Sequence, residues 1–267
     1  MITLLTIIGV GFVLGIRHAT DPDHVIAVTT IVSRQQSIGH AGVIGALWGL
    51  GHTITIVLVG TGIIVFNLAI PPRVGLAMEL AVGLMLILLG ILNLTGLTRW
   101  ITERFTPEHG AGVIHSHVHQ HGGEAHVHTH THDPDAHLGL EERPQGAVQQ
   151  LLQRMGLYQL LRPLAVGIVH GLAGSAAVAL LVLTTIREPR WAIAYLLVFG
   201  LGTIAGMMLI TMMLGVPFAY TGKRFMRFNR GLSVASGVIS IAFGLFITFQ
   251  VGFVNGLFTS HPSWTPH

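Results

Sequence analysis

Residues 2–33 read ITLLTIIGVGFVLGIRHATDPDHVIAVTTIVS, an apolar run with the polar octet RHATDPDH (residues 17–24) at its centre. As a single helix the run would be about 48 Å long, which exceeds a hydrocarbon core of about 30 Å. Pro22 lacks a backbone N–H and disfavours helical geometry at Asp21, the residue before it. The run therefore predicts a membrane helix that is tilted, projecting or broken at the octet.

The composition of the whole chain is typical of a membrane protein. Its 267 residues are 51% hydrophobic and 9% charged, with a mean hydropathy of +0.68, whereas soluble domains carry about 25% charged residues. The apolar runs are continuous rather than alternating, which argues against membrane-spanning strands. The first run lacks a basic flank and a small-residue cleavage site, so we interpret it as a mature helix rather than a signal peptide. We predict an all-α polytopic membrane protein.

A membrane helix needs about 20 apolar residues, and six segments of the chain reach that length. They are residues 2–33, 39–68, 74–97, 163–186, 190–216 and 230–255. The first three spans make up residues 1–98, and the last three make up residues 163–267. Between them, residues 99–162 form a polar, His-rich loop that is predicted to be disordered without metal.

The two halves of the chain resemble each other at nearly constant offsets. The matched segments are Gly15-Ile16-Arg17-His18 with Gly167-Ile168-Val169-His170, Trp48-Gly49-Leu50-Gly51 with Phe199-Gly200-Leu201-Gly202, and Gly83 and Gly90 with Gly237 and Gly244. A repeat of three spans places its second copy in the opposite orientation. Such inverted three-helix repeats recur in secondary transporters, where the binding site lies near the midplane. The alternative is chance similarity between glycine-rich apolar helices.

The distribution of basic residues predicts the orientation in the membrane. With six spans, ten of the 14 Lys and Arg residues fall on the side of the His-rich loop, and three fall on the side of the two termini. Cytoplasmic loops carry the excess of basic residues, so we expect a multi-pass protein of the cytoplasmic (inner) membrane with the His-rich loop inside and both termini outside. The sequence pI of about 10.0 fits loops that face an anionic leaflet rather than nucleic acid.

The octet also supplies candidate metal ligands. Two imidazoles, of His18 and His24, and two carboxylates, of Asp21 and Asp23, lie in the middle of the apolar run. These groups are costly if they face lipid, and together they are donors that nickel, cobalt or zinc prefers. The chain has no Cys, which excludes thiolate sites and thiol catalysis. The alternative is an interfacial loop in which the octet is solvated.

Three further residues of the predicted spans are polar candidates. His52 follows two glycines that allow close helix approach, so it is predicted to be a ligand, with an interhelical hydrogen bond as the alternative. His170, in a small-residue segment that includes Ser175, is assigned to a supporting or gating role beside the metal, with direct ligation left open. Glu79 lies near one end of its span and is interpreted as reaching the interface, with lining of the ion path as the alternative.

The His-rich loop contains two runs in which every second residue is His. These are His115, His117, His119 and His121, and His126, His128, His130 and His132. Alternating imidazoles on a flexible chain bind several borderline cations weakly. The loop is therefore predicted to capture metal, as a buffer, a sensor or a donor to the pore, with a solvated linker as the alternative.

The segment His18-Ala19-Thr20-Asp21-Pro22-Asp23-His24 resembles the signature His-x4-Asp-His of the nickel–cobalt transporter family, with Pro22 where that family usually has Ala. Leu50-Gly51-His52-Thr53 is similar to the family's second helix motif. The segment from Val169 to Ser175 resembles the branch described as urease accessory membrane proteins. The resemblance implies that His18, Asp23, His24 and His52 bind and translocate the metal.

These features together predict a secondary transporter for Ni²⁺, with Co²⁺ as a second substrate and no fixed cofactor. The chain lacks a phosphate-binding loop and the metalloprotease motif, so we do not expect an enzyme. Uptake is favoured over efflux by the same fold, and an intramembrane metalloenzyme or metal sensor is the third reading. The expected partners are the lipid bilayer and the metal ion, with a homo-oligomer, a cytoplasmic nickel chaperone and urease or hydrogenase maturation proteins as further candidates.

Overall fold

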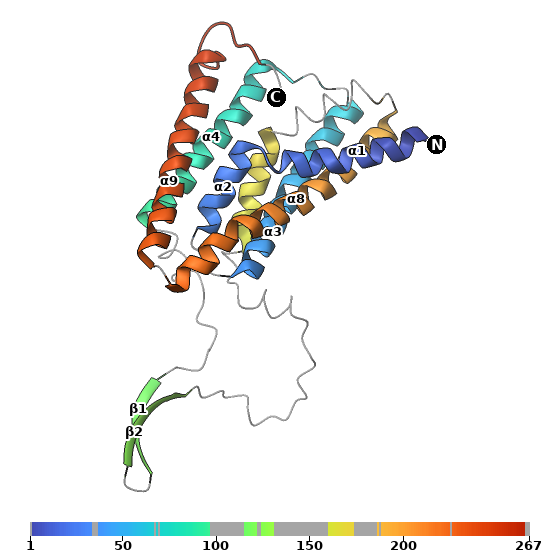
Figure 1. The fold of residues 1–267 in the computed structure, drawn as a ribbon. Coiled ribbons are helices and arrows are strands. Elements are labelled where there is room, and N and C mark those ends of the chain that lie inside the picture. Colours follow the sequence, from blue (N-terminus) through green and yellow to red (C-terminus); the bar gives the residue numbers. More distant parts are fainter. Residues whose placement is uncertain are drawn as a thin grey trace.

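The computed structural model describes residues 2–33, 37–66, 68, 70–96, 115–121, 124–130, 160–173, 186, 188–224 and 226–264. Its helices are α1 (Ile2–His18), α2 (Pro22–Val32), α3 (Ile38–Phe66), α4 (Pro72–Thr95), α8 (Pro189–Arg224) and α9 (Met226–Phe249), which continues into the π-helix η1 (Gln250–Val254). A further helix covers Leu160–Ala173. The helices form one bundle (Figure 1).

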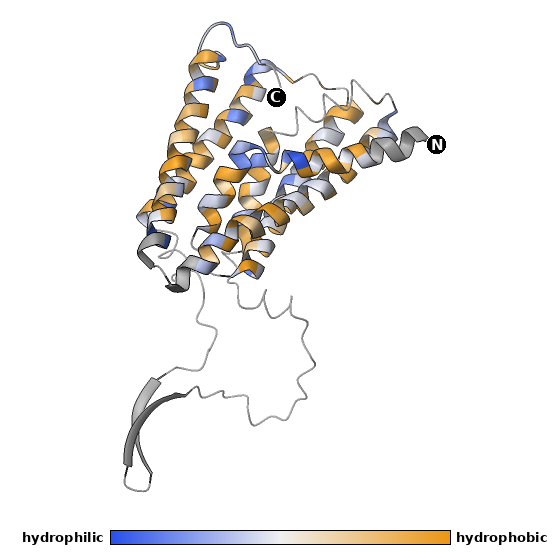
Figure 2. Ribbon diagram, in the orientation of Figure 1, coloured by the Kyte–Doolittle hydropathy of each residue, from blue (hydrophilic) through white to orange (hydrophobic). Residues whose placement is uncertain are grey.

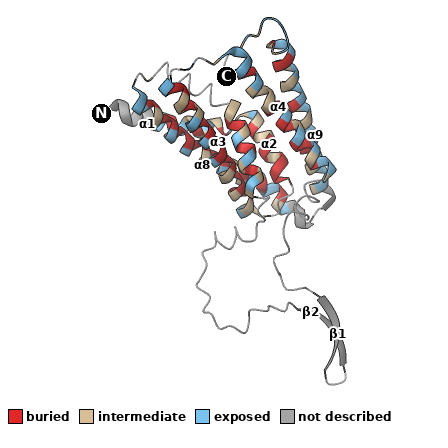
Figure 3. Ribbon diagram, turned by 180° about the vertical axis from the view of Figure 1, so that it is seen from behind, coloured by how far each residue is buried: buried red, intermediate tan, exposed pale blue. Residues whose placement is uncertain are grey.

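Four of the described helices are long and apolar enough to cross a membrane. These spans are Ile38–Phe66, Pro72–Thr95, Pro189–Tyr220 and Asn229–Val254. Their outer surfaces are apolar (Figure 2), and large side chains such as Leu58, Leu201 and Phe246 are exposed there. Buried residues lie on the inner faces, between the helices (Figure 3). The chain is therefore a multi-pass helical membrane protein, as predicted.

The predicted first span is broken rather than continuous. Helix α1 ends at His18, where the Thr20 and Asp21 amides donate to the carbonyls of Arg17 and His18 at 2.8 and 3.1 Å. Helix α2 then begins at Pro22, and Asp21 before it is extended, with φ −59° and ψ 144°. The two helices leave the break in different directions (Figure 1). Proline therefore begins a new helix, since its missing N–H costs nothing at a first helical position.

Two other predicted boundaries differ from the structure. The fourth span, predicted over 163–186, is described only as Leu160–Ala173, and residues 174–185 lie outside the described part of the chain. The fifth span was predicted to end at 216, but α8 continues through Pro217 to Arg224. That boundary was wrong because a membrane helix tolerates an internal proline where its neighbours satisfy the freed backbone groups.

Glycines set the closest helix crossings. A Cβ on Gly83 would meet the Gly244 carbonyl oxygen, and a Cβ on Gly90 would meet the Gly237 carbonyl oxygen at 2.6 Å. As the residue number rises along α4, the number of the contacting residue on α9 falls. The two helices are therefore antiparallel neighbours. Helices α3 and α8 pack in the same way, with Gly49 against Ile204 and Gly200 against Thr53. Small residues allow this close approach of backbones, which stabilises membrane helix pairs.

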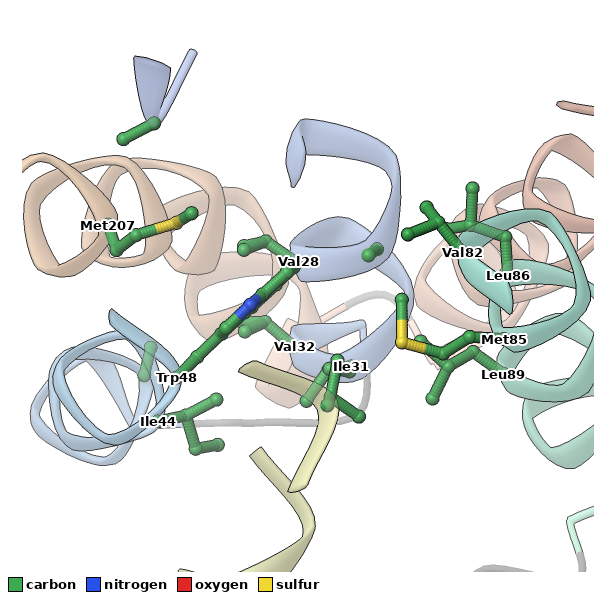
Figure 4. Close-up of a cluster of buried hydrophobic side chains, with 14 residues drawn as sticks. Val28, Ile31, Val32, Ile44, Trp48, Val82, Met85, Leu86, Leu89 and Met207 are labelled. Carbon is green, nitrogen blue, oxygen red and sulfur yellow. The ribbon is translucent and has the colours of Figure 1, made fainter. Parts of the chain in front are cut away.

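Helix α2 lies at the centre of the bundle. Val28, Ile31 and Val32 of α2 pack between two groups of buried side chains (Figure 4). On one side are Ile44, Trp48 and Met207, from α3 and α8, and on the other are Val82, Met85, Leu86 and Leu89, from α4. The helix that begins in the octet therefore separates the α3–α8 pair from the α4–α9 pair.

A buried polar cluster ties the far end of α2 to α4 and α9. Asn93 donates to the Ser233 carbonyl at 2.8 Å and to Ser236 Oγ at 3.2 Å, and its Oδ1 accepts from Ser33 at 3.4 Å. Thr30 Oγ1 lies 3.2 Å from the Ser236 carbonyl. We call Thr30, Ser33, Asn93, Ser233 and Ser236 the inner seam. It joins α2, α4 and α9 at the end of the bundle where α4 ends and the His-rich loop begins.

Two short strands lie within the His-rich loop. Strands β1 (His115–His121) and β2 (Glu124–His130) are antiparallel, and the register places His115 opposite His130, His117 opposite His128 and His119 opposite His126. The sequence analysis did not anticipate this hairpin.

Candidate metal site

The octet at the break between α1 and α2 contributes side chains to a candidate metal site. His18 is the last residue of α1, whereas Asp23 and His24 lie in the first turn of α2. His52 comes from the middle of α3, and His170 comes from the helix Leu160–Ala173. His24, His52 and His170 are buried, with 1%, 0% and 2% of their surface exposed. Side chains from four helices therefore meet at one buried point.

These side chains form two overlapping groups of potential ligands. His18, His24 and His52 make one group, and Asp23, His24 and His170 make the other. Within each group one ligand atom per residue lies within 4.8 Å of the others. His24 belongs to both groups, so the two candidate positions for an ion are adjacent.

The shortest contact between imidazoles joins His18 Nε2 to His52 Nε2 at 3.0 Å. One of these nitrogens must carry a proton for the pair to form a hydrogen bond. A bound cation would take the place of that proton, because both nitrogens can then act as acceptors toward the metal. The pair is therefore arranged as two ligands of one ion would be.

Two carboxylates orient the imidazoles. Asp21 Oδ2 lies 2.8 Å from His18 Nδ1, which leaves Nε2 of the same ring directed at His52. Asp23 contacts two rings, with Oδ1 at 3.1 Å from His24 Nδ1 and Oδ2 at 2.7 Å from His170 Nε2. A carboxylate on the second ring nitrogen fixes the tautomer and raises the basicity of a metal-binding histidine.

Several buried ring nitrogens have no hydrogen-bond partner among the residues that the structure describes. They are His24 Nε2, His52 Nδ1 and His170 Nδ1. Buried polar atoms without partners are uncommon in proteins because each loses its hydration without replacement. A borderline divalent cation would supply the missing partner of His24 Nε2. His24 is the residue that belongs to both ligand groups.

Two aromatic rings enclose the site on the side away from solvent. Trp48, fully buried, lies with its ring 6.0 Å from that of His24 and 5.7 Å from that of His170. Phe199 lies 5.5 Å from the His18 ring. These apolar walls exclude water, which strengthens every electrostatic interaction with an ion held there.

A cavity of about 420 Å³ reaches the site from one end of the bundle. Its lining includes His18, Asp21, Asp23, His24 and His170, together with Glu79, Gln250, Asn255 and Trp264. Glu79 is near the beginning of α4, and the last three follow or end α9, so the cavity lies at the end of the bundle opposite the inner seam (Figure 1). His52 is not among the lining residues and lies deeper.

The structure brings together His18, Asp21, Asp23, His24, His52 and His170, all singled out in the sequence. It places Asp21 on His18 rather than in either ligand group, and it places His170 in one of them. Glu79 is among the residues that line the cavity. Trp264 was missed, and no motif marks it. Ser175 and His132 lie outside the described residues, and the loop histidines from His115 to His130 lie on β1 and β2.

The fold and the site together define a multi-pass helical membrane protein with a candidate metal centre between its helices. The chain belongs to the NicO family, described as high-affinity nickel-transport proteins, whose match covers residues 4–254. It is similar to the urease accessory protein UreH of Bacillus sp. (strain TB-90), with 33% identity over 257 residues, 96% of each chain. No solved structure matches the chain.

Proposed function

We propose that this protein is a secondary transporter that takes up Ni²⁺ through the site formed by His18, Asp23, His24 and His52. The observation that carries the proposal is the convergence of three imidazoles, of His18, His24 and His52, on one buried point at a helix break. Asp21 and His170 support the ligands by orienting His18 and Asp23. Because Co²⁺ binds the same nitrogen and oxygen donors, we propose it as a second substrate.

The second ligand group gives the ion a neighbouring position. Asp23 and His170 lie on the other side of His24, which belongs to both groups. An ion can therefore move by exchanging two ligands while His24 holds it. This stepwise exchange keeps the ion bound to at least one ligand. An ion without ligands inside the membrane would have a far higher free energy, because nothing would replace its hydration.

The cavity supports uptake rather than efflux. It leads to the site from the end of the bundle opposite the His-rich loop, whereas the hydrogen bonds of the inner seam join α2, α4 and α9 at the other end. The excess of basic residues on the loop side favours a cytoplasmic location for the loop in the inner membrane. Two positive charges moving inward gain about 4.6 kcal/mol per 100 mV. Efflux by the same fold is the second candidate, since a cytoplasmic loop rich in His also suits collection of metal for export.

Two inverted repeats of three spans each would provide the alternating access. Contacts between the halves are reciprocal: Gly15 packs on the Phe199 carbonyl and Gly167 on the Trp48 carbonyl, while Gly51 packs on Leu164 and Gly202 on Phe12. The His18 ring lies beside Phe199, and the His170 ring lies beside Trp48. This reciprocity supports a pseudo-twofold axis through the site. Rocking of the repeats about such an axis would expose the site to each side in turn.

We propose that the His-rich loop receives the metal on the cytoplasmic side. The hairpin register pairs three histidines of β1 with three of β2. The similarity to a protein named as a urease accessory protein supports delivery toward a urease or hydrogenase maturation protein or a nickel chaperone.

Purified protein in liposomes tests the proposal. With a membrane potential negative inside, wild-type protein should accumulate radioactive nickel, and the double variant His24→Ala/His52→Ala should not. His40→Ala is the control, because His40 lies in the first turn of α3, outside both ligand groups. Wild-type flux in the double variant would refute the site.

A further inference from the structure

The chain folds back over the cavity after the last helix. Gly256 has a φ of 82°, a conformation that L side chains rarely adopt. The Leu257 and Phe258 amides donate to the carbonyls of Val251 and Gly252 at 3.2 and 3.1 Å. The Ser263 amide donates to the Asn255 carbonyl at 3.0 Å. These bonds hold residues 255–264, which we call the C-terminal strap, in a defined return path to the beginning of α4.

Trp264 fixes the end of the strap to α4 through two contacts. Its indole ring lies against Gly75 so closely that a Cβ on Gly75 would overlap the ring. Its Nε1 donates a hydrogen bond to Glu79 Oε1 at 2.8 Å. Gly75 and Glu79 are four residues apart on α4 and therefore lie on one face of the helix. Gly75 has no side chain that would block the ring, and Glu79 accepts the hydrogen bond from the indole N–H.

Both partners of this hydrogen bond line the cavity that leads to the metal site. The charged residues of the lining are Asp21, Asp23 and Glu79, and neither Lys nor Arg is among them. Glu79 lies on α4, whereas the two aspartates belong to the octet. A cavity lined by one sign of charge between low-dielectric walls concentrates ions of the opposite sign. Glu79 is therefore placed to attract a cation into the cavity that leads to the imidazoles.

We propose that Trp264 is an outer latch and that Glu79 is the carboxylate that an entering divalent cation meets first. With the latch closed, as in this structure, the indole occupies Oε1 of Glu79 and holds the strap against α4. Release of this hydrogen bond lets the indole leave α4 and frees both oxygens of Glu79 for the cation, while the backbone hydrogen bonds of the strap remain. The role of Glu79 rests on the proposed transport function, whereas the latch can be tested without transport.

Labelling of a buried cysteine measures the latch directly. The chain has no Cys, so Val82→Cys introduces a single thiol on a side chain that lines the cavity and is 3% exposed. Trp264→Phe keeps a ring on Gly75 and removes the N–H. We expect this change to speed labelling by a membrane-impermeant thiol reagent about fivefold, the scale of one weak polar interaction. Trp191→Phe, at an exposed tryptophan on α8, is the control and should leave the rate unchanged.

Transport kinetics measure the role of Glu79. Glu79→Gln keeps an oxygen acceptor for the indole and removes the charge. We expect the KM for Ni²⁺ uptake to rise about fivefold, the scale of one partly screened charge interaction, with little change in kcat. Nickel binding to the protein in detergent reports separately that the imidazole site is intact.

The two readouts separate the possible failures. Unchanged labelling in Val82→Cys/Trp264→Phe would show that Trp264 only anchors the strap, and would overturn the latch. An unchanged KM in Glu79→Gln, in a protein that transports nickel, would overturn the role of Glu79. Absence of transport in the wild-type protein would refute the proposed function and with it the role of Glu79, while the labelling rates would still decide the latch.

Discussion

His18 Nε2 and His52 Nε2 lie 3.0 Å apart, although one residue ends α1 and the other lies in the middle of α3. The contact depends on the break at residues 19–21, because a continuous helix would carry the chain past α3 without the change of direction. His24, on the next helix, completes the group.

Loss of one imidazole from the group should abolish tight nickel binding. In His52→Ala the remaining nitrogens of His18 and His24 cannot complete the three-ligand group, and we expect affinity to fall at least about 100-fold. Isothermal titration of nickel into detergent-purified protein measures this. His40→Ala should bind as the wild type does. Equal affinities in all three proteins would contradict the assignment of His52.

Asp21 should act on the metal through His18. In Asp21→Asn the carboxylate that accepts from His18 Nδ1 at 2.8 Å becomes a neutral amide. We expect nickel affinity to fall about 10-fold to 100-fold, as for other carboxylates behind a metal-binding histidine. The same titration applies, and Asp23→Asn, which affects both His24 and His170, should lose more. A larger loss in Asp21→Asn than in Asp23→Asn would argue that Asp21 binds the ion itself.

The crossing of α4 and α9 should not tolerate side chains on its glycines. In Gly90→Ala the new Cβ would lie 2.6 Å from the Gly237 carbonyl oxygen and equally close to Ile241. We expect a lower yield of folded protein and a lower Tm in detergent, because two backbones must separate. Gly62→Ala is a matched control with open space around the new Cβ, and it should be neutral or stabilising by about 1 kcal/mol. Equal Tm values for the two variants would contradict the packing.

Direction of transport should be visible in cells. If the protein takes up nickel, overproduction should raise cellular nickel and sensitivity to the metal, and deletion should lower both. Total cellular nickel measured by mass spectrometry at several external concentrations provides the readout, with the His24→Ala/His52→Ala variant as the control. Increased resistance on overproduction would instead establish efflux.

Much of the protein could be predicted from the sequence because membrane helices are selected by local composition. Continuous apolar runs fix which segments enter the bilayer, and the polar octet within one of them had to be buried in protein or line a cavity. The resemblance of the octet and of the segment around His52 to the nickel–cobalt transporter family implies the group of His18, Asp23, His24 and His52. The choice among a tilted, projecting or broken first helix could not be made, because local sequence does not determine the direction in which a chain leaves a proline.

The sequence by itself determined that this is a helical membrane protein whose first apolar run carries imidazole and carboxylate groups. The free energy of transfer from water depends mainly on which residues a segment contains and little on their partners. Only the tertiary structure decided that Asp21 faces His18, that His170 joins His24 through Asp23, and that Trp264 reaches Glu79. Such contacts join residues far apart in the chain or on either side of a break, and they follow from helix directions and close glycine crossings that no local pattern encodes.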